Sequence, residues 1–563
     1  MTGRTVLRGG SVVGTQAALG GRDASRGSVG EPDPGRDAET VFRADVAIEG
    51  GVIKAVGDIR AEPDDRVIDC SDRYVMPGFV DAHSHADGLL ADDEVQLALL
   101  RQGVTTVVVG QDGLSYAPGD GSYATEYFAA INGAHPSYSG GGIAEYLNLA
   151  DGSSRLNAAI LVPAGTVRFE VCGRADSPAD PGQLKAMVTL VEQGMREGAV
   201  GLSTGLDYVP GLFQSTEEIA ALAAPVAGFG GVYVSHMRGG YEANAAAGIH
   251  EMTRIAQLVR ARTGSALSVH VSHFHADADI VLGQLDALAA AGVDATFDAY
   301  PYIRGCSLLA MPLLPPDLSR QPVDAVVRVL RDPAERQRLR SEWFPRVATY
   351  PSLGAGWPSM ITFAHIRAPE FAWAHGLTID QASRQTGVDA IDLALDVLQA
   401  SRLQVNVVMA VLGSRGLSEL ARIFAHSGHI GGSDAIFIGA HPHPRARGTF
   451  PRFLREYVRE IAAWTWTDAA RHLSRTAAVR FGLGRRGVIA PGAIADLIVV
   501  DPDAVTDTAT YESPSTDAVG IDDVLVAGAP VLSGGRLSGG ALHGALPGRG
   551  LRRNDKTSTD GRS

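Results

Sequence analysis

Residues 75–88, VMPGFVDAHSHADG, close an apolar run with two histidines, His83 and His85. Residues i and i+2 of an extended chain share a face, so both imidazole rings project to the same side of a strand end. Such a pair can form half of a metal site, although so short a motif also recurs by chance. The rest of the chain has to supply the remaining ligands.

Four further polar residues lie at or just past the ends of predicted buried strands. His236 ends GVYVSHMR, His273 ends SVHVSH, Asp434 ends SGHIGGSD, and Asp112 follows TTVVVGQ. A single histidine in such a place is more often an ordinary hydrogen-bonded residue, but five strand ends with metal-capable groups are harder to explain in that way. In an α/β barrel these ends converge on one face, where the site is built. Imidazole and carboxylate suit Zn²⁺ or a similar divalent ion.

The elements that must position these residues alternate along the middle of the chain. Residues 103–110 and 156–165 are short apolar runs typical of buried strands, and residues 183–199 have the pattern of an amphipathic helix. Helical and strand-like segments continue to alternate up to DAYPY. Repeated β-α units with parallel strands predict a barrel or a doubly wound sheet. Residues 310–430 are less regular and are interpreted as an excursion that covers the site.

Strand-like segments joined by glycine turns occur near both chain ends. We therefore expect a small β domain built from residues 1–75 and 485–545, and a barrel formed by residues 76–484. Residues 14–40 are rich in Gly, Asp, Ser and Arg, which predicts a flexible insertion. Residues 546–563 are polar and Gly-rich, which predicts a disordered tail.

The bulk composition limits the class of protein. An apolar fraction of 45% and a charged fraction of 20% are ordinary for a soluble globular chain, and the net charge of −14 disfavours nucleic acid or an anionic membrane as a partner. The sequence lacks a signal-peptide pattern and a run of the ~20 apolar residues that a membrane helix needs. The three cysteines form no CxxC motif, which favours a reducing compartment. We expect a cytoplasmic protein that acts on a small molecule; its oligomeric state is left open.

The motifs resemble those of a known family. The chain is similar to the metal-dependent amidohydrolase superfamily and, within it, to the N-acyl-D-amino-acid deacylases (D-aminoacylases), over roughly residues 41–545. The resemblance rests on PGFVDAHSHAD, GVTTVVVG, GAVGLSTGLDYVPG, GVYVSHMR, VSHFH, FDAYPY, GSD and, above all, HPHPRARGTFPRFL. It implies a (β/α)8 TIM-like barrel, a small β-sandwich from both chain ends and an inserted lid segment.

The resemblance also implies the roles of individual residues. His83 and His85 correspond to ligands of a more exposed metal position, and His236 and His273 to ligands of a tighter one. Asp434 corresponds to an aspartate that contacts metal and moves protons. One or two divalent metals are implied, with Zn²⁺ as the expected ion.

Substrate-binding residues follow from the same resemblance. Arg445 corresponds to a clamp for the substrate carboxylate, which a planar guanidinium can bind with two hydrogen bonds. Tyr208 and Tyr300 correspond to tyrosines that line the pocket. A surface salt bridge for Arg445 and simple packing for the tyrosines are the alternatives.

One departure from the family concerns the metal. The family has a metal-binding cysteine where this chain has Asp112, in GQDG. A carboxylated lysine, used in other branches, is excluded because Lys54, Lys185 and Lys556 fall outside the barrel strands. Asp112 is therefore either a ligand or a hydrogen-bond partner of a ligand histidine. A carboxylate ligand would tolerate Mn²⁺, Co²⁺ or Fe²⁺ better than a thiolate does.

The second departure concerns the substrate. The family commonly has a lysine two residues after the histidine of VSHFH, where this chain has His275. Histidine is only partly charged near neutral pH, so we expect weaker or different binding of the substrate carboxylate. Selectivity for D-amino acids is affected more than hydrolysis itself.

The expected reaction is hydrolysis of the amide bond of N-acyl-D-amino acids, or of closely related N-acyl amino acids, to a carboxylate and a free amino acid. The alternatives within the superfamily are a D-dipeptidase, a hydantoinase-like enzyme and an N-carbamoyl amidase. A non-catalytic scaffold is the alternative outside catalysis, but such relatives lose ligand histidines or the last aspartate, and here all of them remain.

Overall fold

The computed structural model describes residues 3–15, 39–126, 128–350, 353–411, 415–538 and 545–553. The predicted flexible insertion at 14–40 falls almost entirely outside these ranges. Its described ends belong to two paired antiparallel strands, β1 (Thr5–Thr15) and β2 (Glu39–Glu49).

Eight parallel strands form the barrel, in the order β16-β12-β11-β10-β9-β8-β7-β6. Hydrogen bonds from Asp434 N to His83 O (2.7 Å) and from His85 N to Ala435 O (3.0 Å) join the two end strands. The predicted barrel is therefore confirmed. From β6 to β12 and then β16, the strands are Phe79–Asp81, Val104–Val109, Asn157–Pro163, Gly201–Gly205, Val232–His236, Ser268–Val271, Ala295–Ala299 and His429–Gly431.

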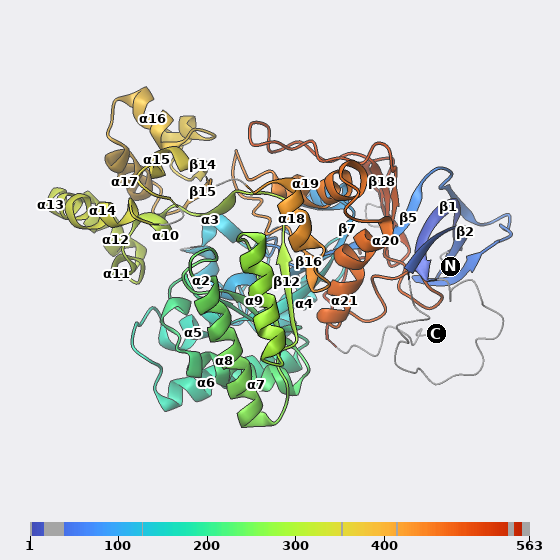
Figure 1. The fold of residues 1–563 in the computed structure, drawn as a ribbon, viewed down its shortest axis with the longest axis horizontal. Coiled ribbons are helices and arrows are strands. Elements are labelled where there is room, and N and C mark those ends of the chain that lie inside the picture. The colour runs from blue at the N-terminus through green and yellow to red at the C-terminus, as the bar shows by residue number, and fades with distance from the viewer. Residues whose placement is uncertain are drawn as a thin grey trace.

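Helices cover the outside of the barrel (Figure 1). They include α6 (Pro181–Arg196), α7 (Thr216–Gly228), α8 (Ala245–Thr263), α9 (Ala278–Ala290) and α18 (Leu417–Phe424). In α6, the Asp180 carboxylate accepts hydrogen bonds from the N–H groups of Gly182 and Gln183, which fixes the start of the helix. Met187, Val191 and Met195 recur at four-residue spacing and are buried, so one stripe of this helix faces the strands.

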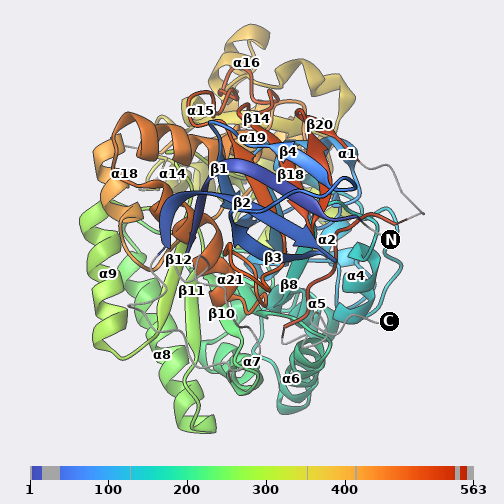
Figure 2. The same ribbon diagram turned by 90° about the vertical axis from the view of Figure 1, so that its right-hand side faces the viewer.

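Both chain ends contribute to one nine-stranded sheet (Figure 2). β5 (Tyr74–Pro77) pairs with β1 on one side and with β17 (Leu497–Val500) on the other, which joins the two ends of the chain. Apolar residues from both parts share one core that includes Val46, Val75 and Leu497. The remaining strands are β3 (Val52–Gly57), β4 (Arg66–Asp69), β18 (Ile521–Val526), β19 (Ala529–Ser533) and β20 (Arg536–Leu537).

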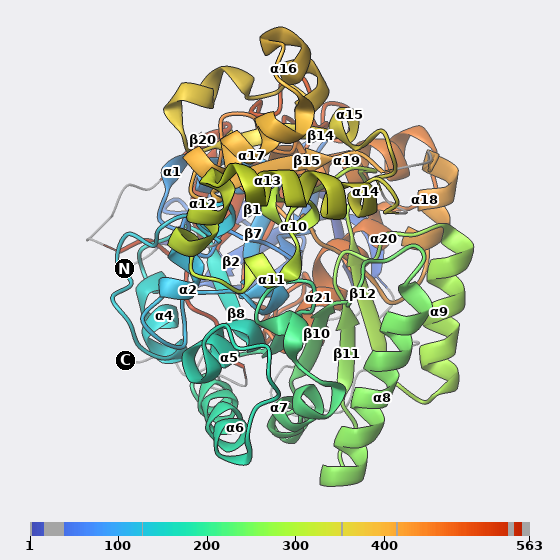
Figure 3. The ribbon, with the colours of Figure 1, turned by 90° about the vertical axis from the view of Figure 1, so that its left-hand side faces the viewer.

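The predicted excursion is an inserted segment between β12 and β16. It contains a three-stranded antiparallel sheet of β13 (Gly305–Leu308), β15 (Val405–Met409) and β14 (Ile361–Ile366), with short helices from α10 (Ala310–Leu313) to α17 (Ala390–Ala400). Figure 3 shows this segment in front of one end of the barrel, whereas the terminal sheet lies on the opposite side in Figure 1.

The expectation of a disordered tail from residue 546 is wrong for residues 546–553. Gly550 forms a parallel bridge with Ala158 of β8, and Leu551 N donates to Ala158 O at 2.7 Å. Leu551 is buried against the barrel. Backbone pairing and the burial of Leu551 order this segment. A polar, Gly-rich composition predicts neither of them. Residues 554–563 lie outside the described ranges. Among the described residues, every helix is too short or too polar to span a bilayer.

Candidate metal centre

Asp81 at the end of β6 ties the first and last barrel strands together. Its carboxylate accepts hydrogen bonds from His83 N (3.3 Å), Ser433 N (2.8 Å) and Ser433 Oγ (2.5 Å). Ser433 directly precedes Asp434. The buried Asp81 therefore fixes the two turns from which His83 and Asp434 reach the barrel mouth.

The six residues that the sequence places at strand ends meet in one cluster. Their potential ligand atoms form two groups, each with all atoms within 4.8 Å of one another, and all six residues are buried. One group contains His83, His85, Asp112 and Asp434; the other contains Asp112, His236 and His273.

Asp112 belongs to both groups. Its Oδ2 lies 3.7 Å from His85 Nε2 and 3.6 Å from both His236 Nδ1 and His273 Nε2, and its Oδ1 lies 3.6 Å from His83 Nε2. One carboxylate thus faces four imidazoles, three of them through Oδ2 and His83 through Oδ1. From this position the carboxylate can offer a ligand atom to both groups.

Three members of the cluster have left-handed backbone conformations that non-glycine residues rarely adopt. The φ angles are 55° at Asp112, 31° at His273 and 50° at Asp434. Such conformations cost free energy and are typical of functional sites that the surrounding structure over-determines. Gly205 packs against the backbone of Asp112. A side chain at position 205 would place its Cβ only 2.0 Å from the Asp112 carbonyl oxygen.

The electrostatics of the cluster fit a divalent cation. Burial lowers the pKa of His85, but the carboxylates of Asp112 and Asp434 outweigh it and raise that pKa to about 10. Burial raises the pKa of Asp112, but His83 and the other imidazoles hold that pKa well below its usual range. His83 Nε2 and Asp112 Oδ1 are buried without a hydrogen-bond partner, so they are free to coordinate an ion.

Two carboxylates outside the cluster, not singled out from the sequence, orient its histidines. Asp298 Oδ2 lies 3.3 Å from His83 Nδ1, and Asp298 Oδ1 accepts a 2.9 Å hydrogen bond from His273 N. Asp207 Oδ2 lies 3.3 Å from His236 Nε2. A carboxylate on the far ring nitrogen fixes the tautomer in which the near nitrogen can bind a metal. Asp298 ends a barrel strand, so the strand-end rule could have found it; Asp207 lies within GLDYVPG, next to Tyr208.

A cavity of about 180 Å³ opens onto the cluster. Tyr208, Tyr300 and His275, all predicted from the sequence, line it together with His85, Asp112, His236, His273 and Asp434. Residues of the inserted segment, including Cys306, Ser307 and Met409, line it as well. The inserted segment therefore forms part of the cavity wall, which agrees with a lid.

Arg445, the predicted clamp, is fully buried but is not among the residues that line this cavity. Its Nη2 lies 2.8 Å from Asp434 Oδ2, and its guanidinium carbon lies 4.6 Å from the centre of the Tyr300 ring. The ion pair is close, but its angles are poor for a hydrogen bond, and within the described part of the chain Nε, Nη1 and Nη2 all lack a hydrogen-bond partner. Arg445 thus retains unused donors beside Asp434. The alternative of a surface salt bridge does not apply.

His275 lies with its ring 4.2 Å from the Tyr300 ring. Burial, followed by the nearby positive charge of Arg415, lowers the pKa of His275 well below its ordinary value. The imidazole is therefore neutral near pH 7 and does not supply the positive charge of a lysine.

Comparison with known proteins agrees with this architecture. The family model described as the amidohydrolase family matches residues 66–532. N-acyl-D-glutamate deacylase of Alcaligenes xylosoxydans xylosoxydans is 32% identical over 471 residues, which cover 82% of this chain and 84% of that protein. D-aminoacylase of the same organism is 30% identical over 497 residues, covering 84% and 86%.

A solved structure extends the similarity to three dimensions. N-acyl-D-glutamate deacylase from Bordetella bronchiseptica, in complex with zinc and a phosphonate inhibitor that mimics the tetrahedral intermediate, matches with a TM-score of 0.76 at 26% identity. The match covers 97% of this chain and 99% of that one. With the family model spanning most of its length, this chain belongs to the amidohydrolase family.

Proposed function

We propose that this chain is a metal-dependent deacylase that hydrolyses the amide bond of N-acyl-D-amino acids to a carboxylate and a free amino acid. The observation that carries the proposal is the convergence of two histidine pairs and Asp434 around the single carboxylate of Asp112. The names of the relatives, N-acyl-D-glutamate deacylase and D-aminoacylase, support the substrate class.

The six clustered residues would hold one or two divalent ions, with Zn²⁺ as the expected metal and Mn²⁺, Co²⁺ or Fe²⁺ as substitutes. Four imidazoles and two carboxylates are a suitable donor set for such ions. A bound ion supplies Lewis acidity, which polarises the amide carbonyl and lowers the pKa of water.

Asp434 is the proposed proton carrier. Burial raises its pKa, but Arg445 and the imidazoles outweigh this and hold the pKa of Asp434 below its ordinary value, so the group is a carboxylate at neutral pH. Its Oδ2 faces Arg445 and its Oδ1 faces His85 at 3.3 Å. Asp434 accepts a proton from water as its oxygen bonds to the carbonyl carbon, and then returns that proton to the amine nitrogen, so that the C–N bond breaks and the amine leaves.

The cavity residues, together with Arg445 next to Asp434 and Tyr300, would position the amino-acid part of the substrate. Arg445 has donors available for a carboxylate, and Tyr208 and Tyr300 supply rings and hydroxyl groups along the wall. The partner is accordingly a small molecule. We propose the cytoplasm as the location, in keeping with the free cysteines Cys70, Cys172 and Cys306.

A substrate panel tests the proposal. Purified protein is loaded separately with Zn²⁺, Mn²⁺ or Co²⁺ and assayed on N-acetyl-D-amino acids, N-acetyl-L-amino acids, dipeptides, hydantoins and N-carbamoyl amino acids. We expect hydrolysis of the N-acetyl-D series above the others and its loss in Asp434→Asn. Turnover only of hydantoins or dipeptides would replace the proposed substrate class while leaving the metal chemistry in place.

A further inference from the structure

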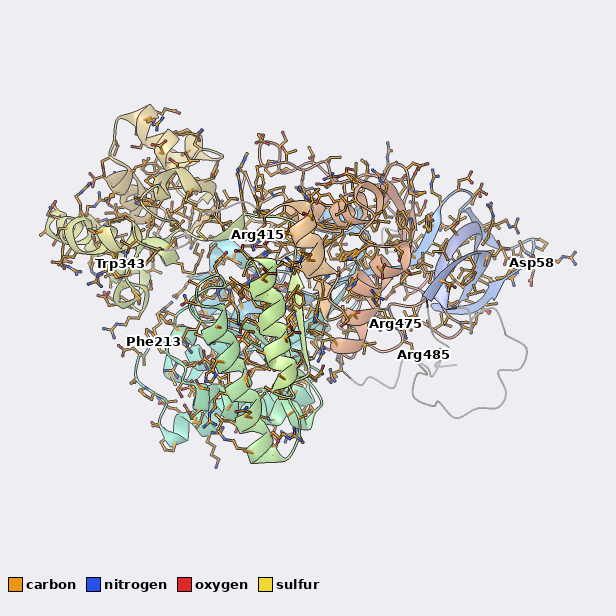
Figure 4. All side chains as sticks on the ribbon, viewed as in Figure 1. Asp58, Phe213, Trp343, Arg415, Arg475 and Arg485 are labelled. Carbon is orange, nitrogen blue, oxygen red and sulfur yellow. The ribbon has the colours of Figure 1, made fainter. Side chains whose placement is uncertain are left out.

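Arg415 is a cavity residue to which neither the sequence patterns nor the proposed mechanism gives a role. It lies just before α18, at the junction of the barrel helices and the inserted segment (Figure 4), and its side chain is only 8% exposed. Its Nη1 donates a 3.0 Å hydrogen bond to the carbonyl oxygen of Ala276. The guanidinium is thus fixed beside the loop that follows β11.

The counter-ion of Arg415 is loosely held. Among the residues that the structure describes, its nearest ion-pair distance is 3.9 Å, from Nη2 to Oε1 of Glu242, whose side chain is 47% exposed. This separation is too long for a hydrogen bond. Arg445, by contrast, has a carboxylate at 2.8 Å, that of Asp434, and Arg304 packs on the ring of Tyr511. A largely buried guanidinium with a distant partner can bind another anion.

A chain of side-chain contacts connects Arg415 to Arg445. Arg445 packs on Tyr300, and Tyr300 packs on His275 at 4.2 Å between ring centres. His275 directly precedes Ala276, which accepts the hydrogen bond from Arg415. Arg415 therefore lines the cavity beside His275, and Arg445 contacts the same stretch of wall from outside the lining, through Tyr300.

We propose that Arg415 binds the α-carboxylate of the substrate and that Glu242 is the counter-ion which the substrate displaces. The inference rests on the proposed function, because an N-acyl amino acid carries such a carboxylate at neutral pH. The cavity also contains the carboxylates of Asp112, Asp434 and Glu242, so an anionic substrate needs a nearby cation. A guanidinium suits a carboxylate because it can donate two parallel hydrogen bonds. Glu242 is half exposed and can turn into solvent.

The test compares a charged substrate with its uncharged counterpart. KM and kcat are measured for N-acetyl-D-methionine and N-acetyl-D-methioninamide with wild type, Arg415→Ala, Glu242→Gln and Arg422→Ala. A hydrogen-bonded charge pair of ordinary strength predicts that Arg415→Ala raises KM for the acid by about 10-fold or more and leaves KM for the amide unchanged. Glu242→Gln lowers KM for the acid because it removes the competitor. Arg422→Ala, an exposed arginine on the following helix, is the matched control and behaves as wild type.

The remaining results would reject the inference, the proposed function or both. An unchanged KM for the acid in Arg415→Ala, or equal increases for acid and amide, overturns the inference. If Arg415→Ala does not fold, an unchanged KM in Glu242→Gln overturns it. Wild-type protein that hydrolyses no N-acetyl-D-amino acid rejects the proposed function and this inference together, whereas active wild type with an unaffected Arg415→Ala rejects the inference alone.

Discussion

Replacing Asp112 with asparagine removes one negative charge from the centre of the cluster and keeps the shape of the side chain. The carboxylate has four imidazole nitrogens within 3.7 Å and belongs to both ligand groups. If Asp112 coordinates metal, the substitution weakens both positions. If it only hydrogen-bonds a histidine, the metal stays and the effect is small.

The expected loss follows from the electrostatics. At an effective dielectric constant of about 20, two unit charges 4 Å apart interact by about 4 kcal/mol, and a divalent ion doubles that figure to about 8 kcal/mol. The asparagine carbonyl recovers part of the loss as a neutral ligand, so we expect a net loss of about 4 kcal/mol. At 1.4 kcal/mol for each factor of ten, metal affinity falls about a thousandfold.

The assay titrates metal-free protein with Zn²⁺ in the presence of a competing chromophoric chelator. Zinc content after dialysis and kcat/KM on N-acetyl-D-methionine are measured in parallel. Asp112→Cys is the matched variant: because a thiolate is a softer ligand, it should retain Zn²⁺ and lose the tolerance for Mn²⁺. Wild-type zinc content and activity in Asp112→Asn would refute the ligand role and leave Asp112 as a hydrogen-bond partner.

Three further outcomes are expected. Asp298→Asn cannot accept the His83 proton at the replaced oxygen, so zinc affinity or kcat/KM falls about 10- to 100-fold; an unaffected variant would contradict the orienting role. Gly205→Ala places a Cβ 2.0 Å from the Asp112 carbonyl oxygen, so Asp112 must move and activity falls about 100-fold; full activity would show that the loop yields easily. Burial lowers the pKa of His472 to about 4 from about 6.5 in the unfolded chain. The unfolded state therefore binds more protons between these values, and stability declines by about 3 kcal/mol as the pH falls from 6.5 to 4. The decline in the thermal midpoint should be smaller in His472→Gln than in wild type, and an equal pH dependence in both would contradict the assignment.

The fold was largely predictable because its periodicities are local. Buried strands such as Val104–Val109 are short, mostly apolar runs rich in β-branched residues, and in helices such as α6 the buried apolar residues recur at four-residue spacing. The segment at 546–553 was not predictable, because its order comes from pairing with Ala158, almost 400 residues away in sequence. The sequence of the inserted segment shows no helical or strand periodicity, because the segment consists of very short helices and a small sheet.

The candidate site was predictable to the extent that it follows the strand-end rule. His83, His236 and Asp434 are polar residues at the ends of buried runs, and the barrel brings such ends together. Residues that reach the site from outside the strand ends have no such sequence pattern. Arg415 approaches the cavity from an irregular region, and the pairing of Arg445 with Asp434 depends on the turn at the end of β16.

Crystals of the zinc-loaded protein, with anomalous diffraction measured above and below the zinc absorption edge, test the account most directly. We predict a zinc peak with an Asp112 oxygen about 2.0–2.2 Å away and with His236 and His273 nitrogens at about 2.0–2.1 Å. A zinc peak away from these three residues, or no zinc among the six clustered side chains, would contradict the account.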